Sequence, residues 1–408
     1  MSGTRLKRVA CLFLYLFSGS LPFAGYGVET GVVTLSLTNV FLILTVLAVV
    51  GTVVIDREVT LGWQQATFIF TGSLLGLYTS LHSALGISTD IRHTITLLGC
   101  VVTAGSLLVL VDSRTILHRV LFSVSVGVAA FSVIGGLAAI GAINPVSKII
   151  PPREIAGFVL PINRTLGGPL AFGSFGILLT TSVAYLAGLL SRSHDWKAKQ
   201  VSILLLAACG IGLLTSQSRS TVLAIVVALG IHTIGIQYNS YSNPGRFVTI
   251  AVRLGAVTFG VLALPLASVL YRVRTTSVTK RFAQVADGIE IATANPVVGL
   301  GRYEYVTQTD GLVIHNTFVE SAAATGVIGV TLIATLWGLA AQRSVRYVLR
   351  GRPVFYSIVV AAAVGGTFVE NLFYLGLFAK PMWFILGLAL TLSRLDGTEQ
   401  QRQTDATQ

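Results

Sequence analysis

Charged side chains are scarce in this chain of 408 residues, of which only 11% are Asp, Glu, Lys or Arg. A water-soluble domain carries about 25% charged residues, so this chain has too few to cover a surface exposed to water. Hydrophobic residues make up 53% of it instead. These figures exclude an ordinary soluble enzyme or binding module and favour a protein that is embedded in a membrane.

Residues that hold metals or form disulfides are also few. The three cysteines, Cys11, Cys100 and Cys209, lie far apart inside apolar runs, which indicates neither a disulfide framework nor a metal cluster. The predicted external segments contain no Asp-x-Asp pair and no group of histidines. A Gly-x-Gly follows Asn295 and Pro296, but without the Gly-Lys-Ser/Thr of a P-loop. We therefore expect neither a metal nor a cofactor.

Long apolar runs recur along the chain, and each could cross a bilayer as a helix. The alternation of polar and apolar residues that a membrane β-barrel requires is not seen. We predict an all-α polytopic integral membrane protein with about twelve transmembrane helices in one membrane domain, residues 1–408. The predicted spans lie near residues 8–25, 32–55, 60–81, 94–111, 117–141, 168–190, 200–215, 220–237, 248–270, 317–341, 354–373 and 377–393.

The basic residues predict how the chain sits in the membrane. Most of the 28 Lys and Arg residues fall between spans on the side that would also hold both termini, including the cluster QRSVRYVLRGR at 342–352. Basic loops mark the cytoplasmic side, so we expect cytoplasmic termini and a polar, unstructured cytoplasmic tail at 394–408. The net charge is +12, and we expect the protein to interact with the lipid bilayer and not with nucleic acid.

An external loop is predicted at 271–316, between the ninth and tenth spans. It is the longest hydrophilic stretch, and it carries cations against the usual insertion bias, namely Arg272, Arg274, Lys280, Arg281 and Arg302. Guanidinium groups match the geometry of phosphate, so an anionic ligand at the outer face would explain them. Ordinary contacts to lipid phosphates would explain them equally well.

His315 lies at the end of this loop, two residues before the tenth predicted span. If that span is a helix with about 100° per residue, Ala322, Gly326 and Gly329 lie within about 40° of the histidine's direction. Small residues let membrane helices approach closely, so we expect this face to press against a neighbouring helix. The positive end of the helix dipole would keep the ring neutral, as a general base requires. The alternative is a structural histidine, with Asn316 as the helix cap.

Two motifs together resemble the signature of the O-antigen ligase and O-antigen polymerase superfamily. They are NPVVGLG at 295–301 and HNTFVESAAATGVIG at 315–329, a His-Asn pair followed after nine residues by Gly-x-x-Gly. Ahead of them the family has an arginine that opens a loop helix, matched by Arg281 in SVTKRFAQVADGIEIATANP. A Ser-Arg pair at the outer start of an earlier span is matched by Arg219 in SQSRSTVLA. A third element matches in part, since NRTLGGPLAFG contains Arg164 but lacks the expected asparagine.

The resemblance implies a GT-C-like membrane glycosyltransferase whose external loop carries short helices. Such an enzyme takes a glycan from a polyprenyl-diphosphate carrier and joins it to an acceptor hydroxyl, with inversion and without a metal ion. The acceptor would be a glycan, a lipid or a protein. The reaction would occur at the external, periplasmic face of the cytoplasmic (inner) membrane, in the assembly of surface polysaccharide or glycoconjugates.

The same resemblance implies roles for individual residues. His315 would activate the acceptor hydroxyl, with Asn316 orienting it. Arg219, at a helix N-terminus, and Arg281 would hold the diphosphate. Arg164 and Arg302 are weaker candidates for the same task. For each arginine, a structural role that fixes the loop to the bundle is an alternative.

Three further residues are expected to support this site. Glu370 lies inside the eleventh predicted span, where carboxylates are rare and usually functional or paired. A buried hydrogen bond from Glu370 to a neighbouring helix is an equally good interpretation. Gly299 and Gly301 would allow a close approach of the backbone in the loop.

Other functions remain open from the sequence. A ligase, which transfers a finished glycan, shares the motif with a polymerase, which extends a carrier-linked repeat. A transporter of lipid-linked saccharides is less favoured, because no internal repeat is evident and the polar groups collect at one face. A non-catalytic membrane scaffold would tolerate the substitution of His315.

Overall fold

The computed structural model describes residues 3–24, 27–29, 34–56, 61–84, 91–142, 154–155, 158–159, 172–216, 218–240, 275–308, 314–349, 355–373 and 379–405. Nearly all of these residues are helical. The helices are α1 (Gly3–Ser20), η1 (Leu21–Phe23), α2 (Leu37–Asp56), α3 (Trp63–Ala84), α4 (Ile91–Leu110), α5 (Arg114–Ala139), α6 (Phe172–Arg192), α7 (Trp196–Ser216), α8 (Arg219–Ser240), α10 (Thr275–Ala294), α11 (Arg302–Gln308), α12 (Thr317–Leu349), α13 (Phe355–Phe373) and α14 (Lys380–Asp405). Two short antiparallel pairs join β1 (Gly27–Glu29) to β2 (Thr34–Ser36) and β3 (Glu154–Ile155) to β4 (Phe158–Val159).

The helices follow the predicted spans closely. Every predicted span except 248–270 coincides with a helix, and 248–270 lies outside the described residues. Within the described part of the chain, 7 helices are long and apolar enough to cross a membrane. Shorter apolar helices within α4, α8 and α14 accompany them. The protein is therefore a helical, multi-pass membrane protein.

The bundle has a buried centre and an apolar outer surface. The side chains of α6, α13 and the first half of α14 are mostly buried, whereas most side chains of α2 and α7 are at least partly exposed. The helices approach closely where glycines meet: a Cβ on Gly127 of α5 would overlap the backbone of Gly19 in α1. Small residues at such crossings are the usual basis of helix packing in membranes.

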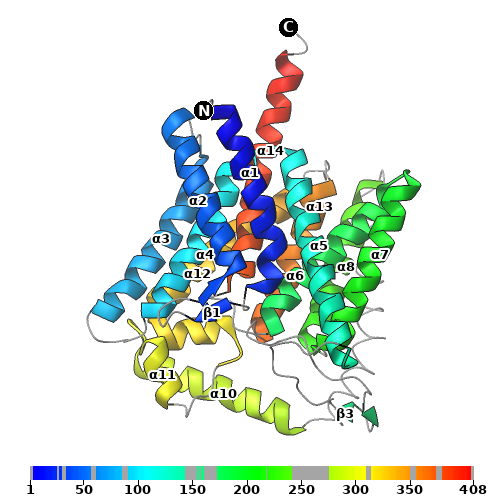
Figure 1. The fold of residues 1–408 in the computed structure, drawn as a ribbon. Helices are drawn as coiled ribbons and strands as arrows, with labels where there is room; N and C mark the ends of the chain where they lie inside the picture. Colours follow the sequence, from blue (N-terminus) through cyan, green and yellow to red (C-terminus); the bar gives the residue numbers. More distant parts are fainter. Residues whose placement is uncertain are drawn as a thin grey trace.

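Both termini lie at one end of this bundle, and α10 and α11 lie at the other (Figure 1). α10 runs across that end, not along the bundle. α10 and α11 are the helices of the predicted external loop. α12 has 33 residues but is interrupted at Gly326, and the 23 residues after this break, 327–349, form a helix of about 35 Å, longer than the ~30 Å of a bilayer's hydrocarbon core. It therefore connects the two ends.

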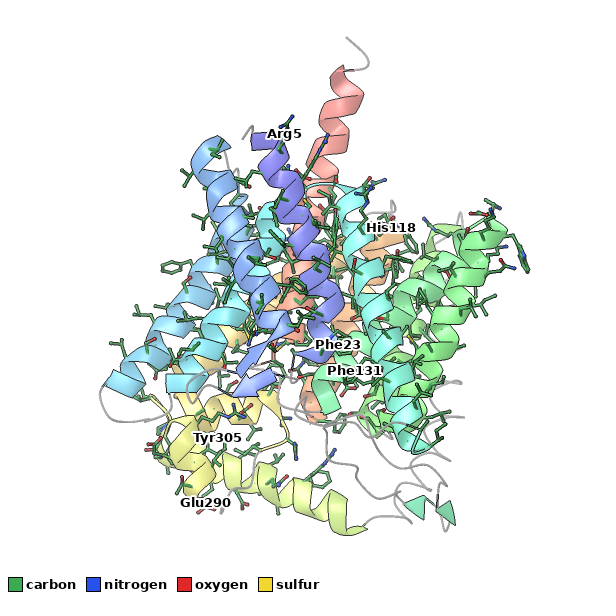
Figure 2. All side chains as sticks on the ribbon, in the orientation of Figure 1. Arg5, Phe23, His118, Phe131, Glu290 and Tyr305 are labelled. Atoms are coloured by element: carbon green, nitrogen blue, oxygen red, sulfur yellow. The ribbon has the colours of Figure 1, made fainter. Side chains whose placement is uncertain are left out.

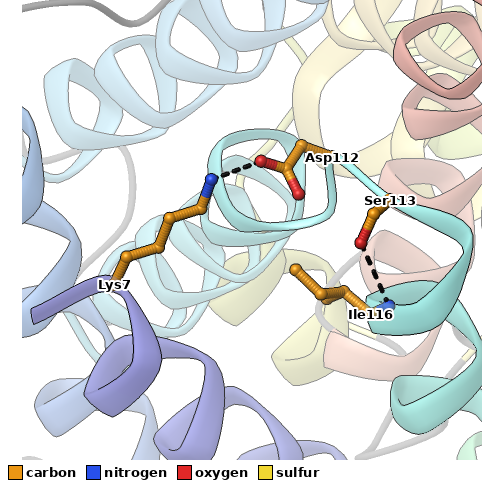
Figure 3. Close-up of polar contacts among 4 residues, drawn as sticks. All are labelled: Lys7, Asp112, Ser113 and Ile116. Carbon is orange, nitrogen blue, oxygen red and sulfur yellow. Dashed lines mark hydrogen bonds and ion pairs between the residues drawn. The ribbon is translucent and has the colours of Figure 1, made fainter. Parts of the chain in front are cut away.

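Polar contacts fasten the end that holds the termini. Lys7 of α1 forms an ion pair with Asp112 in the connection between α4 and α5 (Figure 3). The next residue, Ser113, caps α5, because its hydroxyl accepts a hydrogen bond from the Ile116 nitrogen at 3.4 Å. Lys7 and Asp112 are both partly exposed, so their attraction adds little stability.

The C-terminal tail differs from the prediction. α14 continues as a helix to Asp405, so residues 394–405 are helical and not unstructured. Half of residues 394–405 are Gln, Arg or Glu, which have high helix propensity. The buried first half of α14 supplies the costly helix nucleus, and the tail extends it residue by residue.

Candidate active site

The described residues of the predicted site gather at the end of the bundle opposite the termini. α10 and α11 cover this end (Figure 1). In Figure 2, Tyr305 of α11 and Glu290 of α10 lie there, while Arg5 and His118 lie at the other end. The first turn of α12 and the last turns of α13 reach this end from inside the bundle, as the contacts below show.

Asn316 fixes the turn that carries the histidine. Its Oδ1 accepts hydrogen bonds from the backbone nitrogens of Phe318 and Val319, both at 3.0 Å, so Asn316 is the N-cap of α12. Its Nδ2 donates to the Leu372 carbonyl of α13 at 3.1 Å. The next residue, Thr317, donates to Asn371 Oδ1 at 2.8 Å. The start of α12 is thus tied to the end of α13.

His315 lies half-buried just before this cap. Burial lowers the pKa of His315 from its ordinary value of 6.5, because the imidazolium would lose hydration. The positive charge of Arg281 lowers this pKa further. The ring is therefore neutral at neutral pH and can accept a proton.

Arg281 lies on the side of α10 that faces α12. It is two turns before Gly288 and within about 20° of it around the helix. Gly288 is in contact with the start of α12, since a Cβ there would lie 2.6 Å from Ile314 Cδ1. The Arg281 side chain itself is exposed, and its charge acts on both His315 and Glu370. In the folded protein, three residues predicted for the site, Arg281, His315 and Glu370, are therefore close enough for the charge of Arg281 to act on the other two.

Glu370 of α13 is fully buried. Its carboxyl group lies beside the hydroxyls of Ser220 and Thr221 in the first turn of α8. Ser218 caps the same turn, because its Oγ accepts from the Thr221 nitrogen at 3.4 Å and from Thr221 Oγ1 at 2.9 Å. The sequence allowed a buried hydrogen bond from Glu370 to a neighbouring helix, but among the described residues neither carboxyl oxygen has a hydrogen-bond partner.

Arg219 is the first residue of α8, at the same end of the bundle as Glu370's neighbours. A helix N-terminus is a natural site for an anion, because its first N–H groups have no partner within the helix. The side chain of Arg219 and the whole of Arg164 lie outside the described residues. Their roles therefore stay predictions.

The NPVVGLG turn docks backbone to backbone onto α12. Three hydrogen bonds join them: Leu300 N to Ala323 O at 2.8 Å, Gly301 N to Ala324 O at 3.0 Å, and Val327 N to Pro296 O at 2.8 Å. Gly299 and Gly301 have φ angles of 75° and 83°, which residues with a side chain rarely adopt. A Cβ on Gly299 would lie 2.5 Å from the Gly326 nitrogen. Both glycines therefore allow the turn to sit on the helix.

Gly326 breaks α12 at this contact and corrects one prediction. Its φ of 61° and ψ of −163° are not helical, so the Ala323 carbonyl is free to bond the turn. The expected face of Ala322, Gly326 and Gly329 toward a neighbouring helix is wrong for Gly326, which meets the turn at 295–301. The angular argument failed because it assumed one continuous helix.

Arg302 forms an ion pair with Glu320 within the protein. Its Nε lies 3.1 Å from Oε1 of Glu320, which is fully buried in α12. Tyr305 Oη donates to the same oxygen at 3.1 Å. Burial, and then the charge of Glu320, raise the pKa of Tyr305, which keeps this donor protonated. These contacts hold α11 on α12, the structural alternative that the sequence left open for the arginines.

Sequence reasoning missed some members of this arrangement. It did not pair Glu320 with Arg302 and Tyr305, although a carboxylate in an apolar helix signals a buried partner. It also passed over the hydroxyls of Ser220 and Thr221. Their signal was the serine-rich and threonine-rich stretch SQSRST around the helix start.

Comparison with known protein families agrees with the motifs. The model of the O-antigen ligase family matches residues 203–334. This segment includes α8, α10, α11 and the first part of α12, and with them Arg219, Arg281 and His315. No curated protein matches the chain. The match supports membership of the O-antigen ligase superfamily.

Proposed function

We propose that the protein transfers a glycan from a polyprenyl-diphosphate carrier to an acceptor hydroxyl at the outer face of the cytoplasmic membrane. The transfer is inverting and metal-independent, and it serves the assembly of surface polysaccharide or glycoconjugates. One observation carries the proposal: His315 is half-buried at one end of a membrane bundle, its pKa is lowered by burial and by the charge of Arg281, and both residues lie within the segment that the family model matches.

The arginines would receive the carrier. Arg281 is exposed on the side of α10 that faces α12, and Arg219 begins α8 next to the buried Glu370 neighbourhood. A guanidinium group can bind phosphate oxygens through two parallel hydrogen bonds. At the boundary of the membrane, the diphosphate would reach these groups while its polyprenyl chain stays among the lipid tails.

His315 would perform the proton transfer. The acceptor oxygen attacks the anomeric carbon as its proton passes to the neutral imidazole, and the bond from that carbon to the phosphate oxygen breaks. The bonding electrons leave with the lipid diphosphate, whose growing charge the arginines stabilise. Asn316 would keep the ring in place, because it ties the turn to both α12 and α13.

Glu370, Gly299 and Gly301 would help to position His315 and Arg281. Glu370 lies under the site among the hydroxyls of α8 and feels the charge of Arg281. Gly299 and Gly301 let the turn after α10 dock on α12, so they set where α10 ends and where Arg281 stands. Substitution at these positions would act through the placement of His315 and Arg281.

The proposal is tested in a strain that lacks the protein, complemented with wild type, His315→Ala, Arg281→Ala or the control Glu290→Gln. Glu290 is exposed on the opposite side of α10. We expect transfer to fall by roughly 100-fold or more in the first two variants and to remain normal in the control. Surface polysaccharide and carrier-linked glycan are measured, with membrane levels of each variant.

The identity of the accumulated glycan separates the two activities of the superfamily. Finished chains on the carrier would indicate a ligase, and single repeats would indicate a polymerase. If His315→Ala inserts normally and restores wild-type polysaccharide, the histidine is structural and the proposed mechanism is wrong.

A further inference from the structure

A second group of polar side chains lies at the end of the bundle that holds the termini. It consists of five polar residues, Arg114 and His118 of α5, Tyr185 and Arg192 of α6, and Tyr356 of α13, together with the aromatic Phe355 of α13, and we call it the Arg114–Arg192 cluster. Figure 2 shows His118 near the end marked by Arg5, far from Tyr305. The proposed transfer reaction uses none of these residues.

Contacts between three helices hold the cluster together. His118 Nδ1 and Tyr185 Oη are 2.8 Å apart, within hydrogen-bond distance. The His118 ring also meets the ring of Tyr356 at 6.2 Å between centroids, close to perpendicular. The guanidinium of Arg192 lies over the Phe355 ring at 5.4 Å, a cation–π contact. The aromatic rings thus pack against one another between the ends of α5, α6 and α13.

The charge of the cluster is positive. The positive charges of Arg114 and Arg192 both act on the Tyr356 hydroxyl, and Arg192 lies over the ring of the neighbouring Phe355. Arg192 ends α6, where the helix dipole favours a cation, but Arg114 begins α5, where the dipole disfavours one. A cation kept at a helix start, beside a second cation, is suited to an anionic ligand.

The surface next to the cluster is apolar. His118 stacks on Phe122, one turn further along α5, with 6.3 Å between ring centroids and 19° between ring planes. Phe122 and, one more turn along, Val126 are exposed, as side chains in contact with lipid tails would be. Polar and cationic groups therefore stand directly above an apolar strip, in the order of a phospholipid headgroup above its acyl chains.

We propose that the Arg114–Arg192 cluster binds the phosphate of an anionic phospholipid in the leaflet on the side of the termini. The two guanidinium groups contact the phosphate, Tyr356 donates its hydroxyl, and the acyl chains lie along Phe122 and Val126. Basic pockets between transmembrane helices are known to take anionic headgroups in this way. A free phosphate ion would use the same cations but not the apolar strip.

The test uses the purified full chain in detergent and measures retained lipid by native mass spectrometry. Dioleoyl phosphatidylglycerol, zwitterionic dioleoyl phosphatidylcholine and inorganic phosphate are titrated separately. We expect phosphatidylglycerol to bind in preference to phosphatidylcholine. Arg114→Gln with Arg192→Gln should weaken phosphatidylglycerol binding about tenfold, because two charged hydrogen-bond donors are lost.

The matched control is Arg8→Gln with Arg346→Gln, which removes the same charge from exposed positions at the same end. An equal loss of binding in both double variants would show a general charge effect and overturn the proposal. Displacement of phosphatidylglycerol by millimolar inorganic phosphate would assign the cations to a soluble ion instead. If the cluster variant does not fold, Arg192→Gln alone, at the exposed end of α6, should still weaken binding about threefold.

Discussion

At the scale of single residues, the state of His315 is set by neighbours from other elements. Asn316 caps α12 and anchors the turn to α13, while Arg281 approaches from α10. Burial and the arginine both disfavour the imidazolium, so both act in the same direction on its pKa. The protonation state of His315 therefore depends on burial and on Arg281, which lies 34 residues earlier in the chain.

The rate of transfer should therefore depend on pH through His315. Since the neutral ring is the active form, the rate falls as pH drops through the pKa of His315, and the midpoint should lie below 6.5. Arg281→Gln removes a charge that lowers this pKa, so the midpoint should move to higher pH. Glycan transfer at saturating donor, measured across pH, checks both statements.

Glu290→Gln is the control for this shift, because it removes a charge from the side of α10 that faces away from α12. Its midpoint should match that of wild type. An unchanged midpoint in Arg281→Gln would mean that the arginine does not act on the histidine electrostatically.

At the scale of elements, the site depends on a break in one helix and a turn that fills it. Gly326 interrupts α12, and the turn at 295–301 supplies hydrogen bonds to the groups set free. Because α10 leads directly into this turn, the break also determines how α10, with Arg281, lies over α12. The two glycine motifs of the sequence are thus the two halves of one contact.

Gly326→Ala should disrupt the contact between α12 and the turn at 295–301. The backbone angles are strained for any residue with a side chain, and the new Cβ would overlap Val297 and lie 2.8 Å from the Gly299 nitrogen. We expect a loss of at least about 2 kcal/mol in the free energy of unfolding and a strong loss of transfer. The unfolding midpoint of the purified protein in detergent measures the first.

Gly338→Ala in the same helix is the matched control, since a Cβ there meets no atom within 4 Å. Alanine favours a helix over glycine by up to about 1 kcal/mol, so this variant should be as stable as wild type or more so. Equal stability of the Gly326 and Gly338 variants would show that the break is not required.

At the scale of the whole molecule, the candidate site and the termini lie at opposite ends of the helical bundle. The termini and His118 of the Arg114–Arg192 cluster lie at one end, and α10 and α11, with Tyr305, lie at the other (Figure 1, Figure 2). The distribution of Lys and Arg predicts that the first end is cytoplasmic. An enzyme with this orientation would act on a donor that has already been moved to the outer leaflet.

Labelling of single cysteines in intact cells tests this orientation. The native Cys11, Cys100 and Cys209 are free and buried, so they can be replaced by serine or alanine to give a clean background. A cysteine at exposed Glu290 should react with a membrane-impermeant maleimide, whereas one at exposed Arg346 should react only after permeabilisation. The reverse pattern would place the site in the cytoplasm.

The membrane class, the helix positions and the superfamily could be predicted from the sequence, because each depends on local information. A helix in lipid must satisfy its own backbone groups, so an apolar run of the right length is sufficient to specify it. The spacing from His315 to the glycines is likewise local. The helical tail after Arg394 was missed, since its conformation depends on the buried helix that precedes it.

Only the tertiary structure decided which of these residues meet. The pairing of Arg302 with Glu320, the position of Glu370 beside the hydroxyls of α8, and the docking of the turn on Gly326 join segments that no periodicity links. Buried polar and backbone groups need partners, but many partners would satisfy them equally well. The packing of the whole bundle selects among them, and for that reason the contacts of the site could not be read from the sequence.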